Sequence, residues 1–130
     1  MLGASGGMSR DRPQRRPARI EEENVRGFVE AAVARAFALP VAELRQPTRR
    51  AARVAFARQV AMYVAHVGLG LSLTAAARLF GRDRTTASHA CRVVEDRRDE
   101  PEVEALLAAI ETVTDAWRRL LGPEGPGGAR

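Results

Sequence analysis

The sequence predicts an all-α fold, a bundle of about five helices that contains a helix-turn-helix. Apolar residues recur three or four positions apart in successive segments, which is the period of a helix with one buried face. No segment shows the apolar–polar alternation of a half-buried β-strand. The length of 130 residues allows one domain of ordinary size.

The first helix is predicted over roughly residues 20–38. Its apolar positions follow helical spacing without a miss, and Pro40 prevents continuation; these positions are Val25, Phe28, Val29, Ala32, Val33, Ala36 and Phe37. Residues 41–44 have the pattern of one further turn before Pro47. Residues 48–53 are basic and non-periodic, so they form the candidate basic loop.

A second long helix is predicted from Val54 to about Gly68, with apolar positions that end where Gly68 and Gly70 favour a C-terminal cap and a turn. A short helix follows, capped by Ser72 or Thr74 and continuing to Phe80. Pro101 is predicted to start the last helix. That helix has a strong apolar stripe of Val103, Leu106, Leu107, Ile110, Val113, Trp117, Leu120 and Leu121.

Residues 80–92 have the chemistry of a DNA-reading helix. Gly81 tolerates left-handed geometry and ends the preceding helix, and Asp83 is placed to cap the next by accepting from the amide of Thr85 or Thr86. From Arg84 to Asp96 one side is apolar, through Ala87, Ala90, Cys91 and Val94. The other side presents Arg84, Thr85, Ser88 and Arg92. These features predict a helix-turn-helix at residues 73–96, with one face packed and the other able to touch base edges.

Charge is segregated along the chain. Its 21 basic residues are all arginine, against 16 acids, and the net charge is +5. Residues 1–19 and 40–60 each carry +4 and residues 78–92 carry +3, whereas residues 93–121 hold eight acids against four arginines. This distribution favours a basic face for a polyanion and an acidic face turned away from it. For residues 1–19 alone, an arginine-rich solvated surface is an equal alternative.

Several functional classes are excluded or disfavoured by the residues present. Without lysine there is neither a P-loop nor a Schiff-base nucleophile, so we expect no nucleotide cofactor. Two histidines, His66 and His89, and one cysteine, Cys91, supply no usual metal set and no convincing catalytic dyad, so we expect no metal and no enzyme. Cys91 is expected to be a small core residue. No apolar run is long enough to span a membrane, and a cytoplasmic, nucleoid-associated protein is expected.

The domain prediction places one folded unit at residues 20–121. Residues 1–19 are rich in Gly, Arg and Pro and have almost no large apolar side chains, so they are expected to form a disordered arm. Residues 122–130 are rich in Gly and Pro and are expected to form a flexible tail.

Residues 57–66, Ser72-Leu73-Thr74, residues 81–86 and His89-Ala90-Cys91-Arg92 resemble the C-terminal helix-turn-helix domain (domain IV) of the bacterial replication initiator DnaA. The similarity covers about residues 20–115. It implies that Asp83, Arg84, Thr85 and Thr86 enter the major groove, that Arg50 enters the minor groove, and that Arg58 and Gln59 grip phosphate. His89 is implied to lie against the backbone or to help hold the helix. The full set of candidate DNA-binding residues is Arg49, Arg50, Arg53, Arg58, Gln59, Ser72, Thr74, Arg82, Asp83, Arg84, Thr85, Thr86, Ser88, His89 and Arg92.

The chain departs from the pattern of that family at several positions. The family usually has His in place of Arg84, commonly Pro in place of Thr74, and often one more glycine beside Gly81. Arginine prefers the O6 and N7 acceptors of guanine, so the sequence read by this chain is expected to differ from the initiator's own box.

The resemblance implies a binder of specific double-stranded DNA. Free-standing proteins similar to this domain occur in alphaproteobacteria, and some activate transcription, including that of prophage-like gene transfer agents. We therefore expect a transcription regulator, an activator that works with RNA polymerase or a sigma-like co-activator. The alternative is an accessory or competitor factor at replication origins, binding sites similar to DnaA boxes.

A different class, an interaction module that makes no DNA contact, also fits part of the sequence. In that alternative the stripe ending at Trp117 and Leu121 binds a partner or a second copy, and the arginines only solvate the surface. Against it stands the interpretation that Trp117 closes the domain's own core.

Overall fold

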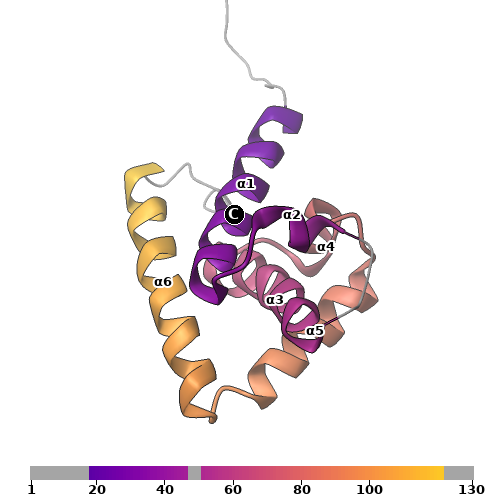
Figure 1. The fold of residues 1–130 in the computed structure, drawn as a ribbon. Helices are drawn as coiled ribbons and strands as arrows, with labels where there is room; N and C mark the ends of the chain where they lie inside the picture. The colour runs from indigo at the N-terminus through magenta and orange to yellow at the C-terminus, as the bar shows by residue number, and fades with distance from the viewer. Residues whose placement is uncertain (1–17, 47–50, 122–130) are drawn as a thin grey trace, which may run out of the picture.

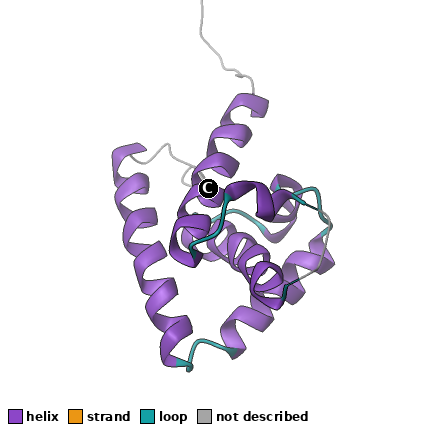
Figure 2. Ribbon diagram, in the orientation of Figure 1, coloured by secondary structure: helices purple, strands orange, loops and turns teal. Residues whose placement is uncertain are grey.

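The computed structural model describes residues 18–46 and 51–121, and within them the fold is all-α, as predicted (Figures 1 and 2). Six α-helices are present in these residues, one more than the five expected, because the turn anticipated after Pro40 is a short helix of its own. They are α1 (Ala18–Phe37), α2 (Val41–Arg45), α3 (Ala52–Tyr63), α4 (Leu73–Leu79), α5 (Arg84–Asp96) and α6 (Pro101–Leu121). None of these helices is long and apolar enough to cross a membrane.

Helix α1 begins at Ala18, two residues before the predicted start and inside the segment that was expected to be a disordered arm. Val25, Val29, Val33 and Phe37 are buried, as the spacing predicts, and Ala34 and Glu30 are buried beside them. The helix ends because Ala38 adopts a left-handed conformation with φ of 56°. The amide of Leu39 then donates to the carbonyl of Ala34 at 2.9 Å, which caps the last turn. Residues 1–17, the rest of the expected arm, lie outside the described residues.

Helix α3 is the central element of the core, with Ala57, Val60 and Ala61 almost completely buried. It starts at Ala52, so Arg53 belongs to its first turn and not to the basic loop predicted for residues 48–53. The predicted long helix does reach Gly68, but its last five residues, Val64–Gly68, form a π-helical turn. A side chain at Gly68 would lie 3.3 Å from Cγ2 of Thr114, so this glycine allows the turn to approach α6 closely.

The turn between α4 and α5 has the geometry that its residues predict. Ser72, and not Thr74, caps α4 by accepting from the amide of Ala75 at 3.0 Å. Gly81 has φ of +69°, the left-handed conformation that ends a helix without steric cost. Asp83 caps α5 by accepting from the amide of Thr86 at 2.9 Å. The helix then runs over Arg84–Asp96, the range that the sequence predicts.

Helix α6 packs along α1 and forms the left edge of the molecule in Figure 1. Val103, Leu107 and Ile110 are buried as expected. The buried stripe then continues through Thr114, not through Val113, whose side chain is 49% exposed. Thr114 tolerates burial because its hydroxyl donates to the carbonyl of Ile110 at 2.8 Å.

Trp117 lies on the core side of α6. Its ring stacks on that of Phe28 in α1, with centroids 4.1 Å apart and an interplanar angle of 11°. The two rings close the gap between the helices, and Trp117 is half-buried there. This contact supports the interpretation that Trp117 completes the domain's own core.

Candidate nucleic-acid interface

Helix α5 has one buried face and one exposed face. Ala87, Ala90 and Val94 are at most 1% exposed and pack against the rest of the domain. Cys91, the fourth member of the predicted stripe, is half-buried. The predicted DNA-reading side lies outward, with exposed Arg84, Thr85, His89 and Arg92 and with half-buried Thr86 and Ser88. The small buried residues bring α5 close to α3 and α4, which hold it as a rigid base for the outward side chains.

The turn before α5 adds exposed polar groups to the same region. Gly81, Arg82 and Asp83 are exposed and precede Arg84 directly. The amide of Thr86, which donates to the Asp83 carboxylate, holds the pKa of that carboxyl below its usual value. The capping role predicted for Asp83 is confirmed, and the cap fixes the backbone of the first turn that carries Arg84 and Thr85.

Two further candidates lie at the start of α4. Ser72 is exposed but its hydroxyl oxygen already accepts from Ala75. Thr74 is exposed in the first turn. In a helix-turn-helix the first helix crosses the DNA backbone, so this helix start is a place for phosphate contacts.

Arg53 and Arg58 bind backbone carbonyls of the domain itself. Arg53 donates from Nη2 to the carbonyl of Phe37 at 2.7 Å, at the end of α1. Arg58 donates from Nε to Leu44 at 3.1 Å and from Nη2 to Glu43 at 3.0 Å, and it also contacts the carbonyl of Gln46. These carbonyls at helix ends have no partner within their own helix. These roles were not predictable from local sequence, because the acceptors lie more than ten residues away along the chain.

The remaining candidates of the basic segment are placed as follows. Gln59 is half-buried in α3. Arg49 and Arg50, with the minor-groove role implied for Arg50, lie outside the described residues. Arg58 also donates to the carbonyl of Gln46, the residue that follows α2.

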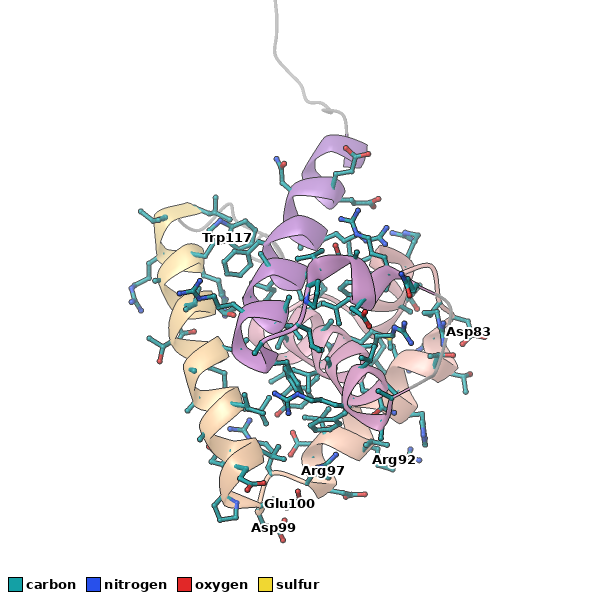
Figure 3. All side chains as sticks on the ribbon, in the orientation of Figure 1. Asp83, Arg92, Arg97, Asp99, Glu100 and Trp117 are labelled. Atoms are coloured by element: carbon teal, nitrogen blue, oxygen red, sulfur yellow. The ribbon has the colours of Figure 1, made fainter. Side chains whose placement is uncertain are left out.

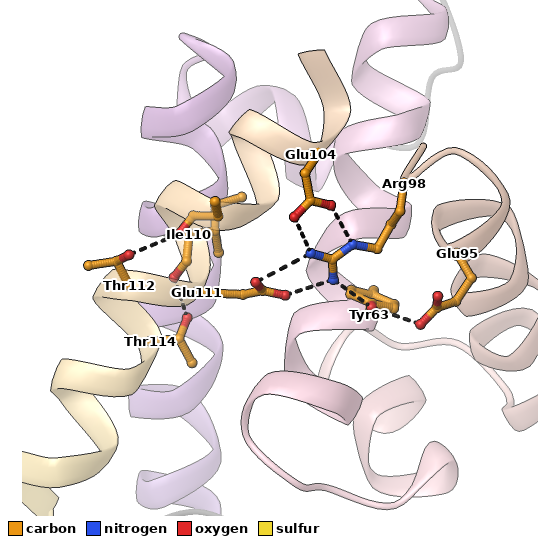
Figure 4. Close-up of polar contacts among 9 residues, drawn as sticks. Tyr63, Glu95, Arg98, Glu104, Ile110, Glu111, Thr112 and Thr114 are labelled. Atoms are coloured by element: carbon orange, nitrogen blue, oxygen red, sulfur yellow. Dashed lines mark hydrogen bonds and ion pairs between the residues drawn. The ribbon is translucent and has the colours of Figure 1, made fainter. Parts of the chain in front are cut away.

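A polar network not predicted from the sequence holds the end of α5 to α3 and α6 (Figure 4). Arg98 donates to both oxygens of Glu104 at 2.9 Å, to Glu111 at 2.9 Å and to the hydroxyl of Tyr63 at 3.0 Å. That hydroxyl donates to Glu95 of α5 at 2.8 Å. The hydrogen bonds that Arg98 donates to Glu104, and next those to Glu111, raise the pKa of Arg98. Arg98 lies in the turn after α5, so the helical spacing of the sequence does not indicate which residues it contacts.

A second unpredicted ion cluster supports α1 and α2. Glu30 is only 2% exposed, although its position in sequence is not among the apolar positions of α1. Its carboxylate accepts from Arg26 at 3.0 Å and from Arg45 at 2.7 Å, so the buried charge is compensated on both oxygens.

The histidines and the cysteine do not come together. His66 has Nδ1 2.7 Å from the carbonyl of Leu71, while His89 is exposed on α5. Burial, and next the charge of Glu95, raise the pKa of the Cys91 thiol, which disfavours the thiolate that a nucleophile or metal ligand needs. Across residues 18–46 and 51–121, no group of three or more His, Cys, Asp and Glu side chains is arranged to hold a metal ion.

Asp83, at the start of α5, and Trp117, near the end of α6, lie on opposite sides of the molecule in the view of Figure 3. The exposed arginines around the first of these positions are Arg82, Arg84 and Arg92, whereas α6 exposes Glu102, Glu104 and Asp115. The last turn of α6 also exposes Arg118 and Arg119, so basic and acidic residues are separated between the start of α5 and the part of α6 before Arg118.

Comparison with known proteins agrees with this geometry. The sequence pattern of the family described as the bacterial DnaA protein helix-turn-helix matches residues 28–94. The chromosomal replication initiator protein DnaA of Thermomicrobium roseum is 37% identical over 93 residues, which are 70% of this chain and 20% of that protein. A crystal structure of a DNA replication initiation factor is similar with a TM-score of 0.62 and 30% sequence identity, over 76% of this chain and 30% of that one. The chain thus spans less than a third of the length of these proteins.

Proposed function

The chain belongs to the family of the bacterial DnaA helix-turn-helix, and from this premise we propose that it binds specific duplex DNA through α5 and regulates transcription in the cytoplasm. The observation that carries the proposal is the outward row of side chains at the start of α5. A helix in the major groove needs exposed donors at its N-terminal end and a packed opposite face. Arg84 and Thr85 supply the donors, and Ala87 and Ala90 the packed face.

Each exposed side chain has a role that follows from its chemistry. Arg84 is suited to pair with O6 and N7 of guanine, and Thr85 to contact a thymine methyl group. Arg82, His89 and Arg92 are suited to phosphate, which positions the protein without reading sequence. Arg58 is given a supporting role, because its donors hold the end of α2 ahead of the basic loop.

The regulatory part of the proposal is activation together with RNA polymerase or a sigma-like co-activator. It rests on the separation of the DNA-reading face from α6, which leaves acidic and apolar surface available on the far side of the domain. No catalytic step and no cofactor is part of the proposed function.

The second candidate is an accessory or competitor factor at replication origins. It is favoured by the similarity to a chromosomal replication initiator protein, because a similar domain would bind the same DNA sites as that protein. Without lysine the chain itself has no P-loop.

Two experiments test these proposals. Titration with random duplex DNA at low and high salt measures the phosphate contribution, and binding that does not weaken with salt contradicts the DNA-binding function. Genome-wide mapping of bound DNA then separates the two roles. Sites at one or a few promoters, together with lower transcript levels after deletion of the gene, support activation. Sites confined to the origin contradict it and support the second candidate.

A further inference from the structure

Helix α6 has a second apolar face, on the side opposite to the core. While Val103, Leu107 and Ile110 are buried, Val113 is 49% and Leu120 85% exposed. The middle of the exposed side is formed by small residues, Ala105, Ala109, Thr112 and Ala116. A surface helix of a monomer ordinarily places charged residues there. Helix propensity accounts for exposed alanines but not for exposed valine and leucine, so the face is suited to contact another apolar surface.

The small residues are spaced four, three and four positions apart, which is the repeat of a helix that packs against one other helix along its length. Because their side chains are short, two helices can approach closely along this line. The same spacing extends the line by one residue at each end. These residues are Glu102 near the start of α6 and Arg119 near its end.

These two end residues carry opposite charges and are both exposed. In the part of the chain that the structure describes, neither of them forms an ion pair. The exposed face therefore has an acid at one end, a base at the other, and uncharged residues between them.

We propose that this face pairs with the same face of a second copy of the chain, with the two α6 helices antiparallel. Two-fold symmetry about a point between residues 110 and 111 sets Ala105 opposite the partner's Ala116 and Ala109 opposite the partner's Thr112. The same register sets Glu102 opposite the partner's Arg119, and this ion pair occurs twice. A parallel pair would instead bring like charges together at both ends, so the charges select the antiparallel arrangement.

The pairing is compatible with DNA binding. Helix α6 and the turn between α4 and α5 lie at opposite edges of the molecule (Figure 1), so the pair leaves Arg84 uncovered. A contact of one helix from each copy is small, and interfaces below about 1,200 Å² are typical of weak, transient complexes. If the proposed DNA-binding function holds, the pair presents two DNA-reading helices on opposite sides and is able to join two duplex segments.

Sedimentation velocity of the full chain without DNA, from low micromolar to millimolar concentration at low salt, tests the pairing independently of the proposed function. We expect a reversible monomer–dimer equilibrium. The variant Ala109→Glu places a charge in the centre of the seam and is expected to abolish the dimer. Ala31→Glu, which makes the same change at an exposed position of α1, is the control and is expected to leave it unchanged. A parent chain that stays monomeric over the whole range, or equal effects of both variants, would overturn the proposal.

Charge reversal tests the register. The single variants Glu102→Arg and Arg119→Glu each create two like-charge contacts, and each is expected to weaken the dimer about fivefold at low salt. The double variant restores both pairs in reversed order and is expected to return to within about twofold of the parent. A double variant as weak as the single variants would overturn the antiparallel arrangement.

Discussion

Arg98 donates a hydrogen bond from Nη1 to the hydroxyl of Tyr63 at 3.0 Å, and through this contact the turn after α5 is tied to the central helix α3. The same guanidinium binds Glu104 and Glu111 of α6. The Arg98 side chain is 24% exposed, whereas Glu104 is 50% and Glu111 37% exposed, so the loss of Arg98 mainly leaves the buried Tyr63 without this donor.

We expect Arg98→Gln to lower the free energy of unfolding by about 1 kcal/mol, since the hydrogen bond to the buried Tyr63 is lost while the ion pairs with the more exposed acids contribute little. Urea denaturation followed by circular dichroism measures the change. Glu100→Gln, which removes the more exposed ion pair with Arg97, is the control and should cost less than about 0.5 kcal/mol. Equal stability of Arg98→Gln and the parent would show that the network does not hold α5.

The same network predicts a dependence of stability on pH. Hydrogen bonds from Arg98 lower the pKa of Glu104 in the folded state. A carboxyl group with a lowered folded-state pKa stabilises the fold above its unfolded pKa, and this contribution is lost as the pH falls. The parent is therefore expected to lose stability between about pH 5 and pH 3, and Arg98→Gln to lose less over that interval. Parallel curves for the two proteins would contradict this origin of the acid sensitivity.

Ala38 is a second position with a definite expectation, because its φ of 56° is unfavourable for a residue with a Cβ atom. Glycine is the usual residue at this position of a helix end. Ala38→Gly is expected to raise stability by about 0.5–1 kcal/mol despite the entropy of glycine in the unfolded chain. Ala31→Gly, inside α1, is the matched control and should lower stability by about 1 kcal/mol. Thermal unfolding measures both changes in stability. If both variants change the stability in the same direction, a left-handed Ala38 is contradicted.

Arg58 distinguishes a supporting role from direct DNA contact. Its donors bind the carbonyls of Glu43 and Leu44, so we expect Arg58→Ala to lower stability by about 1–3 kcal/mol. A side chain fully engaged in the domain makes no phosphate contact, and the slope of log affinity against log salt should then stay unchanged. A slope smaller by about one unit would instead assign Arg58 to a phosphate.

Local signals sufficed to predict the helix-turn-helix. The positive φ of Gly81, the cap at Asp83 and the bounds of α5 each depend on residues within one or two helical turns, and all three agree with the structure. Contacts between distant residues were not predictable in this way. The carbonyl acceptors of Arg58, the burial of Glu30 and the network of Arg98 depend on which helix ends meet in space.

Site predictions show the same division. The outward position of Arg84 and Thr85 follows from the period of the helix and is present in the structure. Arg53 and Arg58 were assigned to DNA from their charge and from the resemblance. In the structure they donate to backbone carbonyls at helix ends, which have no partner within their own helix. Whether any side chain reads a base depends on the DNA, and it stays a prediction.

Selection of bound duplexes from a random pool, run in parallel for the parent, Arg84→Ala and Arg84→His, tests the central claim most directly. Arg35→Ala, at an exposed position of α1, is the control and should select the parent's motif. For the parent we expect a motif with a guanine that Arg84→Ala no longer prefers, at a cost of about 1–3 kcal/mol at that base pair alone. Arg84→His should move the preference toward the box of the initiator. The same motif from all four proteins would contradict the reading of DNA sequence by Arg84.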